Sequence, residues 1–224
     1  MPILSRSEIR ERMKREVDNP TSLVITPLLE EDDALDSDSI NLRLGSYFLL
    51  PRFFQQPFFC PDSKSSSFLQ VSVHVPLGDY LVVPAHQTVL GATLEFIKLP
   101  RNVSGQILTK SSVARTFIVI ETAPWIHPGY RGCLTLEIAN VSNTPLLLYP
   151  GRFMAQLVLM DVSPEEPAAD ERFNPKYLGP VYPEAPSFRD PKDDLAAIGI
   201  PETWVIPERE PGGQRRTRSS PTNR

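Results

Sequence analysis

A short run of polar and basic side chains between residues 109 and 115 has the chemistry of a phosphate site. Lys110 and Arg115 carry positive charges that donate strong hydrogen bonds to phosphate oxygens, and an arginine can bind two oxygens at once. The hydroxyls of Ser111 and Ser112, together with backbone N–H groups, can bind the remaining oxygens. The run is no Walker A loop, because the pattern G-x-x-x-x-G-K-[ST] is missing. By itself it is also typical of a surface turn.

A single carboxylate stands on the polar face of a strand predicted at 133–140. Side chains alternate between the two faces of a strand, so Leu134, Leu136 and Ile138 share one face. The other face carries Glu137 among small residues, namely Cys133, Thr135 and Ala139. Such a face suits the floor of a pocket that holds a general base. It also suits a solvated strand, because charged residues are common on exposed antiparallel faces, and alternation alone leaves both interpretations open.

The histidines and cysteines disfavour a zinc-dependent deaminase. Those enzymes need a histidine or cysteine near a glutamate in H-x-E, followed by P-C-x-x-C. The chain has His74, His86 and His127, and its two cysteines, Cys60 and Cys133, form no C-x-x-C pair. A catalytic zinc site therefore cannot be assembled from a local motif. The cysteine usage also indicates a reducing compartment without disulfides.

Composition argues against several broad classes of protein. With 224 residues, 41% of them hydrophobic, the chain can bury one core of moderate size. A formal net charge of −4 and a pI near 5.5 give no sign of a general nucleic-acid binder. The sequence has no apolar run long enough to span a bilayer and no signal-peptide core at its start. We therefore expect a soluble protein of the cytoplasm.

Short strand-like segments follow a helical start. Ser5-Arg6-Ser7-Glu8 fits a capping box, and Ile9, Met13 and Val17 follow at helical spacing. Strands are expected near residues 40–50, 79–97, 103–108, 116–122, 133–140, 145–149 and 153–161. This spacing predicts a mainly β fold, an antiparallel barrel or jelly roll over residues 1–161 with a short N-terminal helix. A proline-rich C-terminal arm at 162–189 follows, and a polar, basic extension at 190–224 is predicted to be disordered.

Two segments together resemble the dCTP deaminase branch of the dUTPase-like superfamily. They are residues 109–115, here called the phosphate run, and the strand at 133–140 that carries Glu137. Residues 109–115, T-K-S-S-V-A-R, are similar to the family's G-R-S-S-L-A-R. Residues 122–132, T-A-P-W-I-H-P-G-Y-R-G, follow the pattern T-A-x-x-I-D-P-G-x-x-G. Residues 136–140, L-E-I-A-N, match L-E-x-x-N.

Flanking segments extend the resemblance in the same order. Residues 38–45 are similar to S-x-D-x-R-L-G, residues 93–100 to T-x-E-x-x-x-L-P, and residues 150–157 to P-G-x-x-x-x-Q-L. Residues 173–187 resemble the C-terminal K-Y-x-x-Q-x-G…P-S-R segment, which folds over the nucleotide in relatives. The likeness runs from about residue 3 to about residue 189.

The resemblance implies a zinc-independent dCTP deaminase on a distorted dUTPase-like barrel, producing dUTP and ammonia in pyrimidine deoxynucleotide biosynthesis. Glu137 would carry protons between water and the cytosine ring, and Ser111 and Arg115 would orient the water and stabilise charge. The residues implied for nucleotide binding are Lys110, Ser111, Ser112, Val113, Ala114, Arg115, Ala123, His127, Thr135, Leu136, Glu137, Gln156, Lys176 and Tyr177. The resemblance also implies Mg²⁺ bound to the nucleotide, no metal held by protein side chains, dTTP as a candidate effector, and a homotrimer with sites between subunits. It implies no membrane or nucleic-acid partner.

The chain departs from the family pattern at several of these positions. Lys110 replaces an arginine, which keeps the charge and loses the bidentate fork, and Asn41 replaces an aspartate. Pro180 stands where the C-terminal glutamine would be. His127 replaces the aspartate of I-D-P-G, which in dUTPases activates the attacking water, so His127 argues against a dUTPase.

Other features favour a phosphohydrolase. The spacing from Arg115 to His127 and the sequence Tyr130-Arg131-Gly132 look like those of dUTPases. Two alternatives to the deaminase therefore stay open. One is a dUTPase or a bifunctional enzyme that releases dUMP, and the other is a non-catalytic regulator that binds deoxynucleotides.

Overall fold

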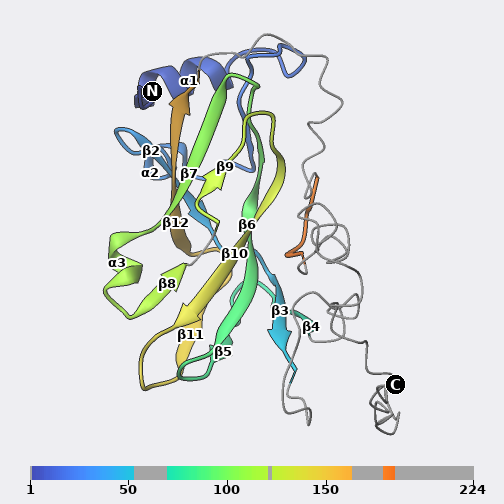
Figure 1. The fold of residues 1–224 in the computed structure, drawn as a ribbon, viewed down its shortest axis with the longest axis vertical. Coiled ribbons are helices and arrows are strands. Elements are labelled where there is room, and N and C mark those ends of the chain that lie inside the picture. The colour runs from blue at the N-terminus through green and yellow to red at the C-terminus, as the bar shows by residue number, and fades with distance from the viewer. Residues whose placement is uncertain (1, 53–69, 121–122, 163–178, 185–224) are drawn as a thin grey trace, which may run out of the picture.

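The computed structural model describes residues 2–52, 70–120, 123–162 and 179–184. These residues form short helices and antiparallel strands (Figure 1). In chain order the elements are α1 (Arg6–Met13), β1 (Val24–Thr26), α2 (Glu31–Ala34), β2 (Ser39–Arg43), β3 (Tyr47–Pro51), β4 (Gln70–His74), β5 (Leu81–Val83), β6 (Thr88–Lys98), β7 (Val103–Thr109), α3 (Ser111–Ala114), β8 (Ile118–Ile120), β9 (Trp125–Ile126), β10 (Arg131–Asn140), β11 (Leu146–Leu148) and β12 (Phe153–Asp161). No helix in this part of the chain is long and apolar enough to cross a membrane. The predicted mainly β class is confirmed.

The N-terminal helix α1 begins at the predicted capping box. The Ser5 N–H donates to Glu8 Oε2 over 2.8 Å, and the Glu8 N–H points back to the Ser5 hydroxyl. Ile9 is fully buried, as its place in the helical pattern predicts. The prediction for Val17 is wrong: the helix ends at Met13, and Val17 is 63% exposed. A turn around Asn19, whose side chain accepts from the Thr21 N–H, redirects the chain before another helical turn can form.

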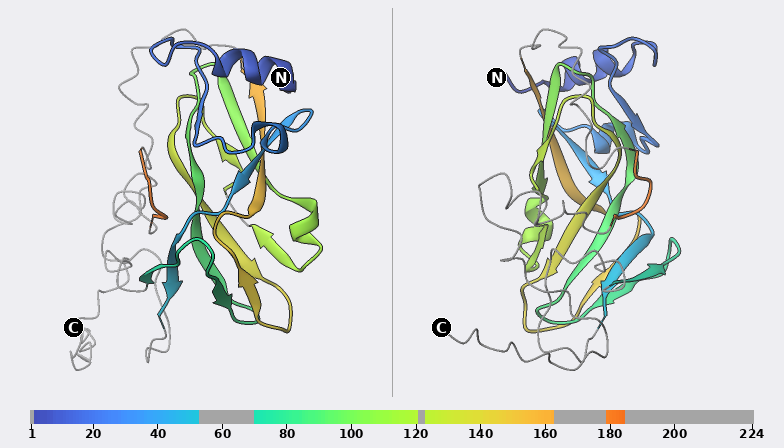
Figure 2. Two further views of the ribbon diagram at one scale, coloured as in Figure 1. Left: turned by 180° about the vertical axis from the view of Figure 1, so that it is seen from behind. Right: turned by 45° about the vertical axis from the view of Figure 1, so that its right-hand side comes forward.

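Two larger sheets pack against each other around one core (Figures 1 and 2). The first has the strand order β4-β3-β6-β10-β8, with β1 added on β6, and the second has the order β2-β12-β7-β9. Strands β5 and β11 form a small separate pair. Phe48 and Leu136 from the first sheet and Leu157 from the second are completely buried. Each such side chain stabilises the fold by about 2 kcal/mol.

Hydrogen bonds between the described strands do not close the two sheets into a barrel. The seam between β7 and β8 is held by a side chain instead, because the Ile120 N–H donates to Thr109 Oγ1 over 2.9 Å. The single strand predicted at 79–97 is two strands, β5 and β6, in different sheets. His86, with a φ of 59°, and a bond from the Gln87 N–H to the Pro84 carbonyl make the turn that separates them. Strands β1, β4 and β9 were not predicted.

Residues Gly179–Glu184 return to the first sheet and lie along β10. The Gly179 N–H donates to the Arg131 carbonyl and the Cys133 N–H donates to the Pro180 carbonyl, both over 2.7 Å. Gly132, with a φ of 142°, permits this approach, since a Cβ there would lie 2.4 Å from Pro180 Cδ. The predictions for the remainder of the arm, Lys176 and Tyr177 included, and for the extension at 190–224 lie outside the described residues.

Candidate active site

Glu137 lies on the outer face of β10, as alternation predicts. Leu134, Leu136 and Ile138 all turn into the core and are at most 7% exposed. Glu137 itself is half-buried and stands opposite Leu90 of β6, which in turn stands opposite Leu49 of β3. Ala139, two residues along the same face, is only 6% exposed. This outer face is therefore partly covered and apolar around the carboxylate, which favours the pocket-floor interpretation over a solvated strand.

A break in strand pairing lies just before Glu137. The register between β10 and β6 shifts between Cys133 and Thr135. Thr93 of β6 fills the break: its hydroxyl accepts from the Leu134 N–H over 2.9 Å and donates to the Glu95 carbonyl over 2.8 Å. The extra residues lie on β6, because Phe96 and Ala92 stand opposite Cys133 and Thr135. Strand β10 therefore keeps its alternation through Thr135 and Glu137.

Asn140, the last residue of the L-E-x-x-N motif, has a structural role. It is 2% exposed, and its Nδ2 donates to the carbonyls of Val83, Pro84 and Thr144 over 2.9 to 3.0 Å. Its Oδ1 accepts from the N–H and hydroxyl of Ser142. Asn140 thus fixes the end of β10, three residues beyond Glu137, against the turn before β6.

Thr135 binds the returning arm on the same outer face. Its hydroxyl accepts from the Glu184 N–H over 3.2 Å. Nearby, the Tyr182 ring meets the Tyr47 ring of β3 edge-on, with centroids 4.5 Å apart. Pro180, which stands where the family pattern has a glutamine, supplies a backbone carbonyl to Cys133 and covers Gly132.

The phosphate run forms the short helix α3 and the residues on either side of it. Ser111, Ser112, Ala114 and Arg115 are exposed, while Val113 is half-buried against the core. Lys110 precedes the helix, and its N–H donates to the Met154 carbonyl of β12 over 3.1 Å. The run therefore presents its hydroxyls and Arg115 to solvent at the seam between β7 and β8.

Lys110 and Gln156 are brought together by a residue that sequence reasoning did not assign to the site. The Lys110 Nζ donates to Asn41 Oδ1 over 2.7 Å, and Gln156 Nε2 donates to the same oxygen over 3.4 Å. Asn41 is 5% exposed, and its Nδ2 donates to the Asp33 carbonyl over 2.9 Å. The fact that Asn41 and Lys110 both depart from the family pattern is the one sequence signal that could have linked them.

The two groups of predicted site residues lie on different sheets. Gln156 pairs with Leu108 and Asn41 in register, on the outer face of the second sheet. Glu137 and Thr135 are on the outer face of the first sheet. Since the core lies between these sheets (Figure 2), the outer faces point in different directions. Within one chain, Gln156 and Lys110 are not brought together with Glu137.

Ala123 and His127 lie on either side of the short strand β9. Both are exposed, and the His127 carbonyl accepts from the Tyr130 N–H over 3.2 Å. Leu136, also predicted to bind nucleotide, has its side chain fully buried in the core, so only its backbone could contact a ligand.

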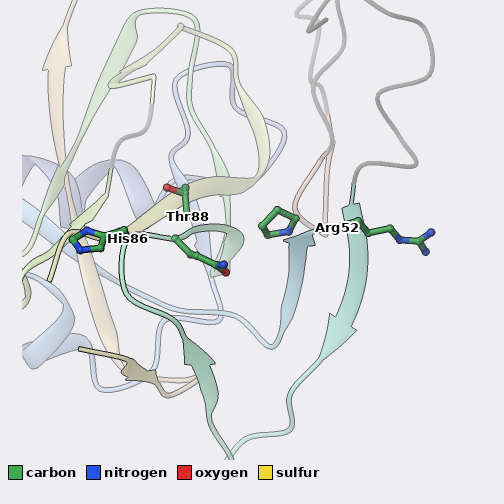
Figure 3. A pocket seen from close by; sticks show the side chains of 5 residues that line it. Arg52, His86 and Thr88 are labelled. Atoms are coloured by element: carbon green, nitrogen blue, oxygen red, sulfur yellow. The ribbon is translucent and has the colours of Figure 1, made fainter. Parts of the chain in front are cut away.

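A shallow hollow of about 350 Å³ lies at the start of β6 and the end of β3, bordered by Pro51, Arg52, His86, Gln87 and Thr88 (Figure 3). His86 Nε2 bonds to Asn143 Oδ1 over 2.9 Å. None of the described residues predicted for the site borders this hollow. The hollow is therefore not part of the predicted site.

Burial changes the acidity of three groups, one on β6, one on β10 and one just before β10. Glu95 is 2% exposed, and loss of hydration raises its pKa to about 7, although its bond from the Arg43 N–H opposes the rise. Burial also raises the pKa of the Cys133 thiol, with a smaller contribution from Glu95. Burial raises the pKa of Tyr130 as well, and its hydroxyl donates to the Cys133 carbonyl over 2.8 Å. Among the described residues, no three His, Cys, Asp or Glu side chains come together as metal ligands.

Comparison with known proteins agrees with the motifs and the fold. The family model described as dCTP deaminase-like matches residues 3–162. A relative from Methanobrevibacter smithii named "dCTP deaminase, dUMP-forming" is 30% identical over 189 residues, which cover 83% of this chain and 94% of the relative. A relative from Haloarcula marismortui named "dCTP deaminase" is 30% identical over 196 residues, covering 85% of this chain and 97% of the relative.

A solved structure supports the fold. The 2'-deoxycytidine 5'-triphosphate deaminase from Agrobacterium tumefaciens superposes with a TM-score of 0.54 at 24% identity, over 71% of this chain and 48% of that chain. The fold and the matched family model together define the class, a mainly β protein of the dCTP deaminase kind. The chain belongs to the dCTP deaminase-like family.

Proposed function

We propose that the chain hydrolytically deaminates dCTP, with Glu137 as the group that moves the protons. The observation that carries this proposal is the half-buried carboxylate of Glu137 on a partly covered, apolar face of β10, inside the family's L-E-x-x-N motif. A carboxylate in such a place can accept a proton from one partner and return it to another without exchanging it with bulk water.

The reaction requires a defined set of proton transfers. Water adds through its oxygen to C4 of cytosine as Glu137 takes one of its protons, and Glu137 passes that proton to N3. The second proton of the added water moves to the amino group, the C4–N bond breaks, and ammonia leaves with uracil formed. Ser111 and Arg115 hold the water and stabilise the charge of the adduct.

The two groups of site residues imply that a second chain completes the site. Glu137 and Thr135 lie on one outer face, whereas Lys110 and Gln156 lie on the outer face of the other sheet. We propose that the triphosphate, carried with Mg²⁺, binds Lys110, Ser112 and Gln156 of one chain. Its base then lies between Ser111 and Arg115 of that chain and Glu137 of the next. A cyclic oligomer closes such head-to-tail contacts, and the resemblance implies a homotrimer.

A second candidate is a bifunctional reaction that also cleaves the product to dUMP. The printed name of the Methanobrevibacter smithii relative favours it, as does the dUTPase-like spacing from Arg115 to His127. Against it stands His127, which replaces the aspartate that dUTPases use to activate water. His127 is exposed, so its side chain is accessible to a nucleotide.

Product analysis separates these functions. Purified protein is incubated with dCTP and Mg²⁺, ammonia is measured, and nucleotides are resolved by ion-exchange chromatography. Ammonia with dUTP supports the first candidate, and ammonia with dUMP and pyrophosphate supports the second. Binding of dCTP without turnover would reject both and favour a regulator. Addition of dTTP in the same assay tests it as an effector.

A substitution of Glu137 tests whether its carboxylate moves the protons of the reaction. We expect Glu137→Gln to abolish ammonia release while dCTP affinity stays within a few-fold of wild type, because the shape is kept and only the base is lost. Glu184→Gln is a matched control on the same face. Glu184 contacts Thr135 through its backbone N–H, so this variant should retain activity. Substantial turnover by Glu137→Gln would contradict the proposed role of Glu137.

A further inference from the structure

A buried, neutral acceptor holds the ammonium group of Lys110. The Lys110 Nζ donates to Asn41 Oδ1 over 2.7 Å. Among the described residues, no carboxylate forms an ion pair with Lys110. Its Nζ also lies 5.8 Å from the centroid of the Phe153 ring. The described part of the chain therefore fixes the position of Lys110 through a neutral oxygen and not through a carboxylate.

Asn41 is built to serve as this acceptor. It is 5% exposed, its Nδ2 is anchored on the Asp33 carbonyl over 2.9 Å, and its Oδ1 also accepts from Gln156 Nε2 over 3.4 Å. The Asp33 bond determines which end of the amide faces Lys110, since only the oxygen can accept from an ammonium. Three chain segments, β2, β12 and the β7–α3 junction, are joined in this way.

We infer that Asn41 is a positioning residue. It holds Lys110 in place without neutralising its charge, so that the ammonium group can bind the polyphosphate of the nucleotide. This inference rests on the proposed function. A lysine ammonium is a compact point charge with three donors. Asn41 occupies one donor, and two remain for phosphate oxygens. A carboxylate at position 41 would bind the same nitrogen and cancel most of its charge.

The same physics explains why positions 41 and 110 differ from the family pattern together. An arginine has five donors on a planar fork, so it can bind a carboxylate with one edge and a phosphate with the other. A lysine cannot divide its charge in that way. Lysine at 110 is therefore compatible with asparagine at 41, and arginine at 110 with aspartate at 41.

Four variants at these two positions test the inference through dCTP binding, measured by isothermal titration calorimetry with Mg²⁺. Asn41→Asp should weaken dCTP binding about tenfold or more, the loss typical of a charge-assisted hydrogen bond. Asn41→Ala, which removes the acceptor without adding charge, should weaken it about fivefold. Lys110→Arg alone should stay within about threefold of wild type. Asn41→Asp with Lys110→Arg should recover most of the affinity.

The control is Gln106→Glu, which adds the same charge on the same outer face. Gln106 is half-buried on β7, four residues from Lys110 and thus about 13 Å away along the strand. It should change dCTP affinity less than about twofold. Inorganic tripolyphosphate should compete less well for Asn41→Asp, whereas competition by deoxycytidine, which has no phosphate, should be unchanged.

Turnover separates this inference from the proposed function. If dCTP is deaminated, Asn41→Asp should raise KM and leave kcat within about threefold, because the charge acts on binding. If the wild type binds dCTP without turnover, the proposed function fails while the titrations still test the inference. Equal losses in Asn41→Asp and Gln106→Glu, or no recovery in the double variant while its thermal melt matches wild type, would overturn it.

Discussion

Glu95 should make the stability of this protein depend on pH. Its side chain is 2% exposed within β6 and accepts the Arg43 N–H over 2.9 Å. Burial raises its pKa from 4.5 to about 7, with the hydrogen bond and charge of Arg43 opposing the change. The folded state therefore keeps the Glu95 proton over a pH range in which the unfolded chain has already lost it.

The sign and size of the effect follow from this difference in pKa. Between pH 4.5 and about 7 the folded state binds more protons than the unfolded state, so stability falls as pH rises. The contribution is fully present below pH 4.5 and is lost as pH rises through about 7. At 1.36 kcal/mol per pKa unit, the total loss is roughly 3 kcal/mol.

Urea unfolding at several pH values between 4.5 and 8 measures this loss. Glu95→Gln stays neutral throughout, so the free energy of unfolding of wild type relative to this variant should fall by roughly 3 kcal/mol over the range. The exposed Glu16 provides the control: Glu16→Gln should give no comparable trend against wild type. Parallel curves for wild type and Glu95→Gln would refute the reasoning.

Two further outcomes are expected. Gly132→Ala should lower the free energy of unfolding by about 1–3 kcal/mol by displacing Pro180. Gly78→Ala, at a φ of 93° with nothing within 4 Å, carries only the backbone strain and should cost less; equal costs in urea unfolding would contradict this packing. Dialysis against a zinc-selective chelator should leave deamination intact once Mg²⁺ is restored, and a loss that only Zn²⁺ repairs would show that the reaction class is wrong.

The strands that carry the site could be predicted because their signals are local. Alternation identified the two faces of β10, and the outward position of Glu137 follows from it. The half-burial of Glu137 does not, because it depends on the neighbouring strands. The capping box located the start of α1. The end of that helix was missed because helical spacing extends to Val17, whereas turn chemistry at Asn19 redirects the chain.

The parts that sequence reasoning missed depend on contacts between distant segments. Asn41 meets Lys110 across 69 positions of sequence, and Thr93 meets Leu134 across 41. Periodicity carries no information about such pairs. Burial of Glu95 was likewise invisible, since its polar side chain gives no sign of the N–H from Arg43 that it accepts.

Complementation between two inactive variants tests the central claim, that Glu137 of one chain acts on a nucleotide held by the phosphate run of another. Glu137→Gln and Arg115→Ala are each expected to release little ammonia from dCTP. Co-expressed and purified together as randomly assembled oligomers, they should regain about a quarter of wild-type activity, because one site in four then takes both intact residues from different chains. If each site were instead built within a single chain, the mixture would stay as inactive as its components.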